Sequence, residues 1–150
     1  MPHAEARRVA TQLTRAVHGP AWHGPSLRAA LAGVSARQAA LRPIPAAHSI
    51  WEIAAHAAAW IRIVRLRLEG RGPKSVPKAV NFPTPRRGTA AEWQGVRARL
   101  RDETARLART VRALDDEQLP YLAVHGIVQH TTYHAGQIVL LKKAIKGSRP

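Results

Sequence analysis

The chain has 150 residues, 45% of them hydrophobic, which is enough to bury one core, and we expect a single domain over residues 1–150. The absence of cysteine excludes disulfides, thiolate zinc sites and an internal thiol nucleophile, so imidazole or carboxylate groups would have to hold any metal ion. The net charge of +15 permits nucleic acid, an anionic membrane surface or an anionic substrate as a partner, without choosing among them.

The basic residues are mostly arginines scattered along the chain, and aromatic residues make up only 5%, which leaves few platforms for stacking bases. Genome-wide base bias also produces an arginine-rich, alanine-rich composition, and we favour that explanation over DNA binding. The N-terminal residues lack the continuous apolar core of an export signal, and no stretch approaches the roughly 20 apolar residues of a membrane span. We therefore expect a soluble, cytoplasmic protein with no membrane partner.

The N-terminal third of the chain predicts one helix followed by two short ones. Residues 5–17 carry a helical apolar stripe that ends at a Gly-Pro pair. Ser26 has the position of an N-cap for a short helix that ends near Gly33. Ser35 and Gln38 form a capping-box pattern, which opens another turn or two before the next prolines stop the helix.

A second capping-box pattern, Ser49 with Glu52, predicts the start of a long helix that reaches residues 69–70. His56 lies on the broad apolar face of this predicted helix and therefore points toward the core. A lone histidine on an apolar face is more often a hydrogen-bonded core residue than a metal ligand, so His56 alone does not define a site. The inward positions are Ile50, Ile53, His56, Ala57, Trp60, Ile63, Val64 and Leu68.

Residues 71–88 form a predicted surface crossover that is rich in Gly, Pro, Lys and Arg. Their four prolines exclude a regular helix. A connection of about 18 residues is long for a compact domain. We expect either a mobile segment or a functional flap near one end of the helix bundle.

A third capping-box pattern, Thr89 with Glu92, opens the clearest helix of the sequence. Its apolar residues alternate in steps of three and four: Trp93, Val96, Leu100, Thr104, Leu107, Val111 and Leu114. The opposite face is most simply a solvated surface, with phosphate contact as the less favoured interpretation. That face carries Arg97, Arg99, Arg101, Arg106, Arg109 and Arg112.

The final predicted helix spans residues 121–146 and ends at Gly147. The turn before it is short, so the third long helix and this one should be antiparallel neighbours. Polar groups in the middle of an apolar line are unfavourable unless they are paired or bound to a ligand. The predicted inward line is Gly126/Ile127, His130, His134, Gln137 and Leu141.

Four long amphipathic helices without a strand pattern predict an all-α protein, a four-helix up-down bundle with a long crossover between helices two and three. His130 and His134, four residues apart, leave one face of the last helix and could share a metal ion with His56. Such a pair also arises by chance, so the third ligand is essential. Three imidazoles leave an open coordination position, as in catalytic zinc sites, and nickel and iron also accept imidazole. Thr131 occupies the glutamate position of HExxH, which disfavours a protease.

Three sequence segments resemble the DinB-like superfamily of four-helix bundles, which is related to YfiT-type metal-dependent hydrolases and bacterial thiol S-transferases. The segments are WHGPSL, HSIWEIAAHAAAW and HGIVQHTTYHAGQIVLLKKA, and the resemblance covers residues 22–144. It implies that His56, His130 and His134 are the metal ligands, with zinc or nickel as the first choice and iron as the next. Many members carry an acidic residue where this chain has Thr131.

Two further residues are candidates for catalysis. Glu52 lies one turn before His56 and could act as a general base, although we favour its capping role. Tyr133 and Gln137 neighbour His134 and could orient it or donate a hydrogen bond, while core packing explains Tyr133 equally well.

The other histidines are weaker candidates. His125 is rotated away from the ligand line, so a surface or supporting role is favoured over coordination. His23 and His48 flank the long helices and could line the mouth of a site.

Three functions stay open at this point. The first is a metal-dependent enzyme, a hydrolase or S-transferase, that activates water or a low-molecular-weight thiol toward a small-molecule substrate. Because the chain has no cysteine, the thiol would come from solution. The second is a non-catalytic, stress-related protein that binds metal, nucleic acid or a protein partner, and the third is a vestigial bundle without metal. An exposed apolar strip on the first helix would permit a homodimer.

Overall fold

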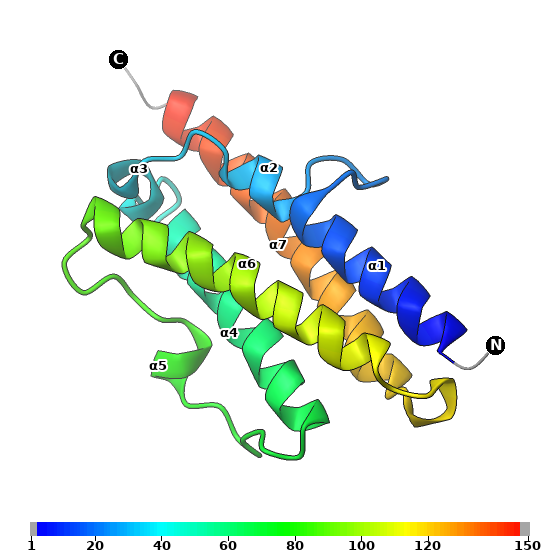
Figure 1. Ribbon diagram of the computed structural model, residues 1–150. Helices are drawn as coiled ribbons and strands as arrows, with labels where there is room; N and C mark the ends of the chain where they lie inside the picture. The colour runs from blue at the N-terminus through cyan, green and yellow to red at the C-terminus, as the bar shows by residue number, and fades with distance from the viewer. Residues whose placement is uncertain (1–2, 148–150) are drawn as a thin grey trace.

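The computed structural model describes residues 3–147, which contain helices and no strand, so the predicted all-α class is confirmed (Figure 1). Within this range no helix combines the length and apolar character needed to cross a membrane. In chain order the elements are α1 (Ala4–His18), α2 (Leu27–Leu31), α3 (Ala36–Ala40), α4 (Ile50–Leu68), α5 (Lys78–Asn81), α6 (Ala90–Arg112), η1 (Asp116–Gln118) and α7 (Tyr121–Gly147).

Local capping fixes where four of these helices begin. Ser26 accepts a hydrogen bond from the amide of Ala29 at the start of α2. At α3, α4 and α6 the predicted capping boxes are all present, with each N-cap hydroxyl bonded to the amide three residues on and that residue's side chain bonded back. A cap of this kind contributes about 1 kcal/mol. The three boxes are Ser35 with Gln38, Ser49 with Glu52, and Thr89 with Glu92.

The four long helices pack in an order that differs from the prediction. Helix α1 packs against α6 and α7, and α4 packs against the same two helices. Across residues 3–147, α6 and α7 form no comparable interface, so the predicted neighbour packing of the third and final long helices is wrong. Figure 1 also shows α4 and α6 running in the same direction, unlike an up-down alternation. The crossover is long enough to carry the chain back along the bundle before α6 begins.

The core is built from the predicted inward faces. Trp51 of α4 and Trp93 of α6 lie with ring centroids 5.2 Å apart, and the Trp93 indole donates a 2.8 Å hydrogen bond to the carbonyl of Val34. The apolar positions of α1 are buried in this core, and the exposed large hydrophobic residues lie elsewhere in the described chain. The exposed apolar strip expected on the first helix is therefore absent.

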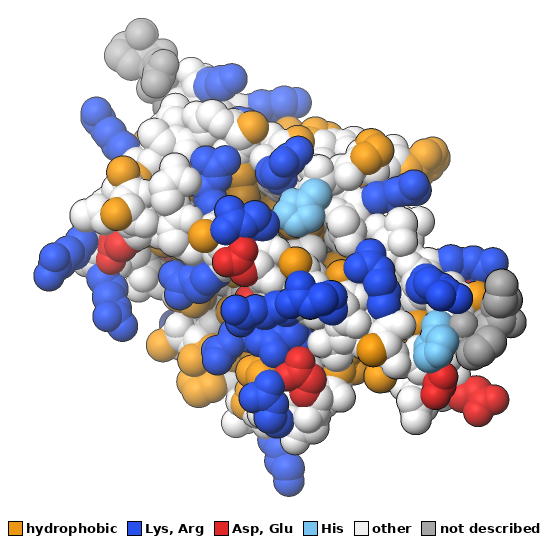
Figure 2. All heavy atoms as spheres, in the orientation of Figure 1, with side chains coloured by type: hydrophobic (Ala, Val, Ile, Leu, Met, Phe, Trp, Pro, Cys, Tyr) orange, Lys and Arg blue, Asp and Glu red, His pale blue; other side chains and the backbone are white. Residues whose placement is uncertain are grey.

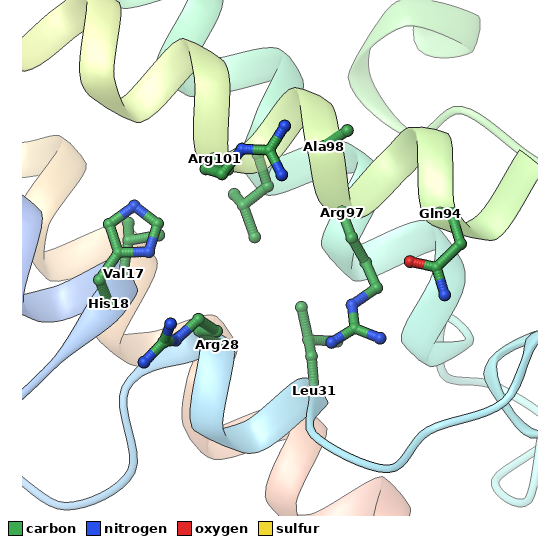
Figure 3. A pocket seen from close by; sticks show the side chains of 9 residues that line it. Val17, His18, Arg28, Leu31, Gln94, Arg97, Ala98 and Arg101 are labelled. Atoms are coloured by element: carbon green, nitrogen blue, oxygen red, sulfur yellow. The ribbon is translucent and has the colours of Figure 1, made fainter.

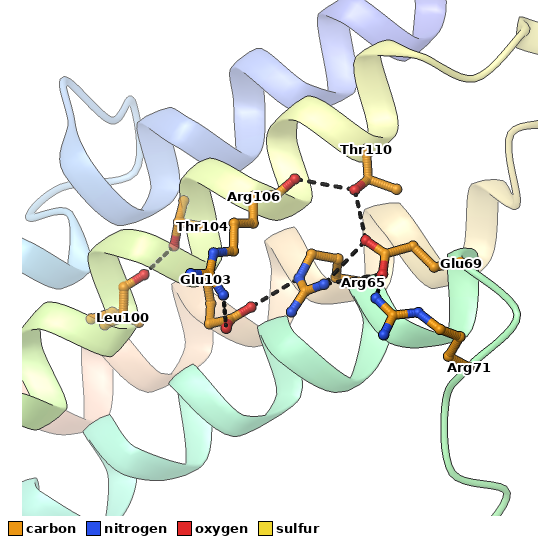
Figure 4. A network of polar contacts seen from close by, with 8 residues as sticks. All are labelled: Arg65, Glu69, Arg71, Leu100, Glu103, Thr104, Arg106 and Thr110. Atoms are coloured by element: carbon orange, nitrogen blue, oxygen red, sulfur yellow. Dashed lines mark hydrogen bonds and ion pairs between the residues drawn. The ribbon is translucent and has the colours of Figure 1, made fainter.

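Arg65 of α4 and Glu103 of α6 tie the two parallel helices together (Figure 4). They are only 8% and 7% exposed, and Arg65 Nε donates a 2.9 Å hydrogen bond to Glu103 Oε2. Arg65 Nη1 also donates to both carboxylate oxygens of Glu69 at 3.1 Å, and Thr110 Oγ1 donates to Glu69 at 3.3 Å. None of these contacts is predicted by the capping or periodicity patterns of the sequence.

Substituting Glu103→Ala is expected to lower the free energy of unfolding by about 3 kcal/mol, because it leaves the buried guanidinium of Arg65 with one fewer counterion. Urea denaturation measures this loss. The matched control is Asp102→Ala on the same helix, whose exposed ion pair with Arg101 contributes less than about 1 kcal/mol. Equal losses in the two variants would contradict a special role for the buried pair.

Candidate metal centre

Three histidines from two helices converge on one point between α4 and α7. The Nε2 atom of His130 lies 2.9 Å from Nε2 of His56 and 3.0 Å from Nε2 of His134. The potential ligand atoms of the three residues all lie within 4.8 Å of one another. His56 and His134 are buried and His130 is half-buried. The structure thus brings together the three residues that the sequence analysis selected.

Hydrogen bonds at the Nδ1 atoms of His56 and His134 determine which nitrogen of each ring carries the proton. His56 Nδ1 donates to the backbone carbonyl of Asn81 at 2.6 Å. His134 Nδ1 donates to Oε1 of Gln137 at 2.7 Å, and Gln137 Nε2 donates in turn to the hydroxyl of Tyr133. Because these oxygens accept hydrogen bonds, the proton of each neutral ring sits on Nδ1. Nε2 of both His56 and His134 therefore presents a lone pair to the centre.

His130 cannot satisfy both of these lone pairs. A neutral imidazole carries one proton, so His130 Nε2 donates to one neighbour at most. Its Nδ1 is buried and has no hydrogen-bond partner among residues 3–147. A divalent cation, in contrast, accepts lone pairs from all three Nε2 atoms, a donor set that suits zinc, nickel or iron. The residues present therefore fit a metal ion better than a self-contained hydrogen-bond network.

The protonation of the triad also favours metal binding. Burial lowers the pKa of His56 to about 4, an effect that the hydrogen bond to Asn81 opposes and the nearby His134 reinforces. Burial, followed by the neighbouring His134 and His56, lowers the pKa of His130 to about 4. Burial also lowers the pKa of His134. The rings are neutral at pH 7, which is the form that binds a metal ion.

The crossover covers the site, which the sequence analysis did not foresee in detail. It contains a four-residue helix, α5, where no regular helix was expected, and α5 packs against α4. Asn81 accepts hydrogen bonds from His56 through its backbone and from the Trp60 indole through its side chain, the latter at 2.7 Å. Phe82 stacks on His56 with centroids 4.0 Å apart, and His48 stacks against Phe82 at 3.7 Å. Phe82 is the only phenylalanine in the sequence, a signal that could have drawn attention to it.

An apolar pocket of about 490 Å³ opens beside His134. Its walls include Ile44 and Ile53 from one side and Leu140 and Leu141 of α7 from the other. The polar groups that reach it are those of His48, Tyr133, His134 and Gln137. His48 lines this pocket, whereas His23 is an exposed loop residue away from this lining.

The α7 face toward the core is shifted from the predicted line. Ile127, His134 and Leu141 are buried as expected, but His130 and Gln137 are half-buried. Thr131 is instead fully buried, and its hydroxyl donates to the carbonyl of Ile127 at 2.8 Å. His130 therefore lies at the edge of the core and His134 lines the apolar pocket, whereas the Thr131 hydroxyl is bonded within its own helix.

Glu52 is a buried capping residue. It accepts a 2.8 Å hydrogen bond from the Ser49 amide and pairs with Arg42, which confirms the favoured capping role. Burial acts to raise the pKa of Glu52, but the hydrogen bond from Ser49 and the charge of Arg42 outweigh it, so the net pKa is lowered. In the part of the chain described, neither carboxylate oxygen contacts the triad, and the general-base role stays an untested prediction.

Tyr133 lies at the rim of the pocket. Its side chain is 62% exposed, so the core-packing explanation is wrong. Its ring lies edge-on to His134 with centroids 5.2 Å apart, and its hydroxyl accepts the hydrogen bond from Gln137 at 3.0 Å. Tyr133 and Gln137 thus support His134, as the sequence suggested. His125 lies apart from the triad, half-buried, with its ring tilted against that of Tyr121 at a centroid distance of 3.9 Å.

Lowering the pH from 7 to 5 is expected to destabilise the metal-free protein. The unfolded chain has ordinary histidine pKa values near 6.5 and the folded chain has values of about 4 at His56 and His130, so the unfolded state binds more protons between these limits. The contribution of these two neutral histidines to the free energy of unfolding is complete above pH 6.5 and is lost as the pH falls toward 4. Urea denaturation with a chelator present measures the free energy of unfolding at pH 7 and pH 5. The decrease between the two pH values should be smaller in His130→Gln than in the wild type, and as large as in the wild type in the exposed control His23→Gln. Equal losses in all three proteins would contradict this origin.

Comparison with known proteins agrees with the family suggested by the histidine motifs. A family model described as the DinB superfamily matches residues 21–138, a span that contains all three histidines of the triad. No curated protein and no solved structure matches the chain. Since the family model covers more than half of the residues, the chain belongs to the DinB superfamily.

Proposed function

We propose that this protein is a metal-dependent enzyme in which His56, His130 and His134 hold one divalent ion, with zinc or nickel as the first choice and iron as the next. The observation that supports this most directly is that the three histidines have too few N–H donors to satisfy one another. Two lone pairs, fixed by Asn81 and Gln137, meet at a nitrogen of His130 that can donate to one of them only. Membership of the DinB superfamily agrees with a metal site at these positions.

The reaction we propose is hydrolysis or S-transfer on a small-molecule substrate. When bound, a divalent ion supplies a Lewis acid that lowers the pKa of a coordinated water or thiol. The chain has no cysteine, so a thiol reaction takes a low-molecular-weight thiol from solution. The apolar pocket beside His134 would bind the apolar part of the substrate next to the triad. We place this activity in the cytoplasm, in a stress-related role.

The surrounding residues have separate tasks in this proposal. Asn81 and Gln137 hold the rings of His56 and His134 in the tautomer that presents Nε2. Phe82 covers one face of His56 and keeps water from it. Tyr133 accepts a hydrogen bond from Gln137, so its own hydroxyl proton is free to be donated into the pocket that it lines. Tyr133 is therefore the better supported of the two catalytic candidates, ahead of Glu52.

Elemental analysis of protein purified without a His tag or added metal tests the site. We expect close to one divalent ion per chain in the wild type and none in the His130→Ala/His134→Ala variant. The matched control is His23→Ala/His125→Ala, which removes two histidines outside the triad and should keep the ion. A wild-type protein that holds no ion and does not rebind zinc, nickel or iron would overturn the proposal. A bound ion without turnover would instead favour a non-catalytic metal-binding protein.

Tyr133→Phe tests the catalytic assignment. Once a thiol-and-electrophile or ester screen gives turnover, this change should lower kcat about a hundredfold, because it removes the hydroxyl donor. The metal content should stay the same, because Gln137 keeps its own contact with His134. The other tyrosine of the chain provides the control, since Tyr121→Phe alters an exposed residue at the start of α7 and should leave kcat unchanged. Unchanged kcat in Tyr133→Phe would remove Tyr133 from the mechanism.

A further inference from the structure

A second pocket lies on a different face of the molecule, between α2 and α6 at the end of α1 (Figure 3). Its volume is about 460 Å³. Its floor is apolar, with Val17, Leu31 and Leu100 among its residues. It shares no lining residue with the pocket beside the triad. The polar side chains around it are those of His18, Arg28, Gln94, Arg97 and Arg101.

The charge around this pocket has one sign. No aspartate or glutamate lines it, and Figure 2 shows Lys and Arg crowded over this face with few acidic groups among them. Within residues 3–147, Arg28 and Arg97 have no carboxylate partner, and Arg101 pairs only with its exposed neighbour Asp102. Three guanidinium groups around one pocket, two of them without a carboxylate partner in this range, create a positive field that attracts an anion.

The imidazole of His18 lies in the field of two of these arginines. Burial lowers the pKa of His18, and the charges of Arg28 and Arg101 lower it further. The two arginines, which come from different helices, therefore act on one point at the edge of the pocket. Figure 3 shows Arg28, Arg97 and Arg101 arranged with His18 around an open space.

The shape of the site selects a class of anion. Guanidinium groups match phosphate oxygens in pairs and are the preferred side chains for that recognition. The volume falls within the range of small-molecule pockets, and the apolar floor would accept an organic group. A nucleic-acid backbone would instead follow a continuous basic groove with aromatic platforms, and none of the side chains that line this pocket is aromatic apart from the imidazole of His18.

We propose that this pocket binds a phosphorylated small molecule, with Arg28, Arg97 and Arg101 around the phosphate groups and the organic part on the apolar floor. The side chains of Gln94 and His18 supply neutral hydrogen-bonding groups at the rim. The site is separate from the histidine triad and does not depend on the metal-dependent reaction proposed above. A loss of metal binding would therefore leave this proposal intact, and the reverse also holds.

Titration calorimetry with pyrophosphate and ADP as probes tests the proposal on the full chain at low ionic strength. We expect the Arg28→Gln/Arg97→Gln variant to bind both probes at least about tenfold more weakly than the wild type, since each guanidinium contributes charge-assisted hydrogen bonds. The matched control is Arg109→Gln/Arg112→Gln, which removes two exposed arginines of α6 outside the pocket and should keep wild-type affinity. Equal weakening in both variants, or no binding by the wild type, would overturn the proposal.

Two further measurements separate a pocket from a general basic surface. A short DNA duplex serves as a third probe, and if it alone binds, with equal weakening in both double variants, the face is a nucleic-acid surface and the proposal fails. The His18 imidazole provides a spectroscopic signature, because a bound anion offsets the charges of Arg28 and Arg101 and raises its pKa. NMR titration should detect this rise with pyrophosphate in the wild type and the control variant. An unchanged His18 pKa at saturating pyrophosphate would place the anion elsewhere.

Discussion

The site depends on one constraint, which is that three neutral imidazoles must turn the same nitrogen toward a common point. An imidazole has two nitrogens, and the contact made by one decides whether the other can act as a ligand. His56 is set by the carbonyl of Asn81 and His134 by the side-chain oxygen of Gln137. Burial then keeps the rings uncharged, so they do not repel one another. Burial and hydrogen bonding thus act together to direct unprotonated Nε2 atoms toward one point.

The two oxygens that accept hydrogen bonds from His56 and His134 come from different parts of the chain. Gln137 lies one turn beyond His134 and is supplied by the same helix. Asn81 belongs to the crossover, which has to lie against α4 to reach His56. The same crossover returns the chain along the bundle, so that α6 runs parallel to α4 and the buried pair of Arg65 and Glu103 can link them. The parallel course of α4 and α6 and the tautomer of His56 therefore both depend on this crossover.

Features that depend on a few neighbouring residues could be predicted from the sequence. The capping boxes at Ser35, Ser49 and Thr89 and the shared helix face of His130 and His134 are local, and the structure contains them. The role of Gln137 beside His134 is local as well. Features that depend on distant segments could not be predicted in the same way. The contacts of Asn81 and the packing of α6 away from α7 depend on how the crossover folds, which no periodicity in its proline-rich sequence specifies.

The stack of His48, Phe82 and His56 joins three parts of the chain through the faces of their rings. His48 comes from the loop before α4, Phe82 from the crossover and His56 from α4 itself. Because Phe82 is the middle ring, the crossover cannot lift without uncovering an imidazole on each side and withdrawing the neighbouring carbonyl of Asn81. Opening of this segment and loosening of the His56 ring are thus one event. Conditions that hold the triad together should also slow proteolytic cleavage of the crossover.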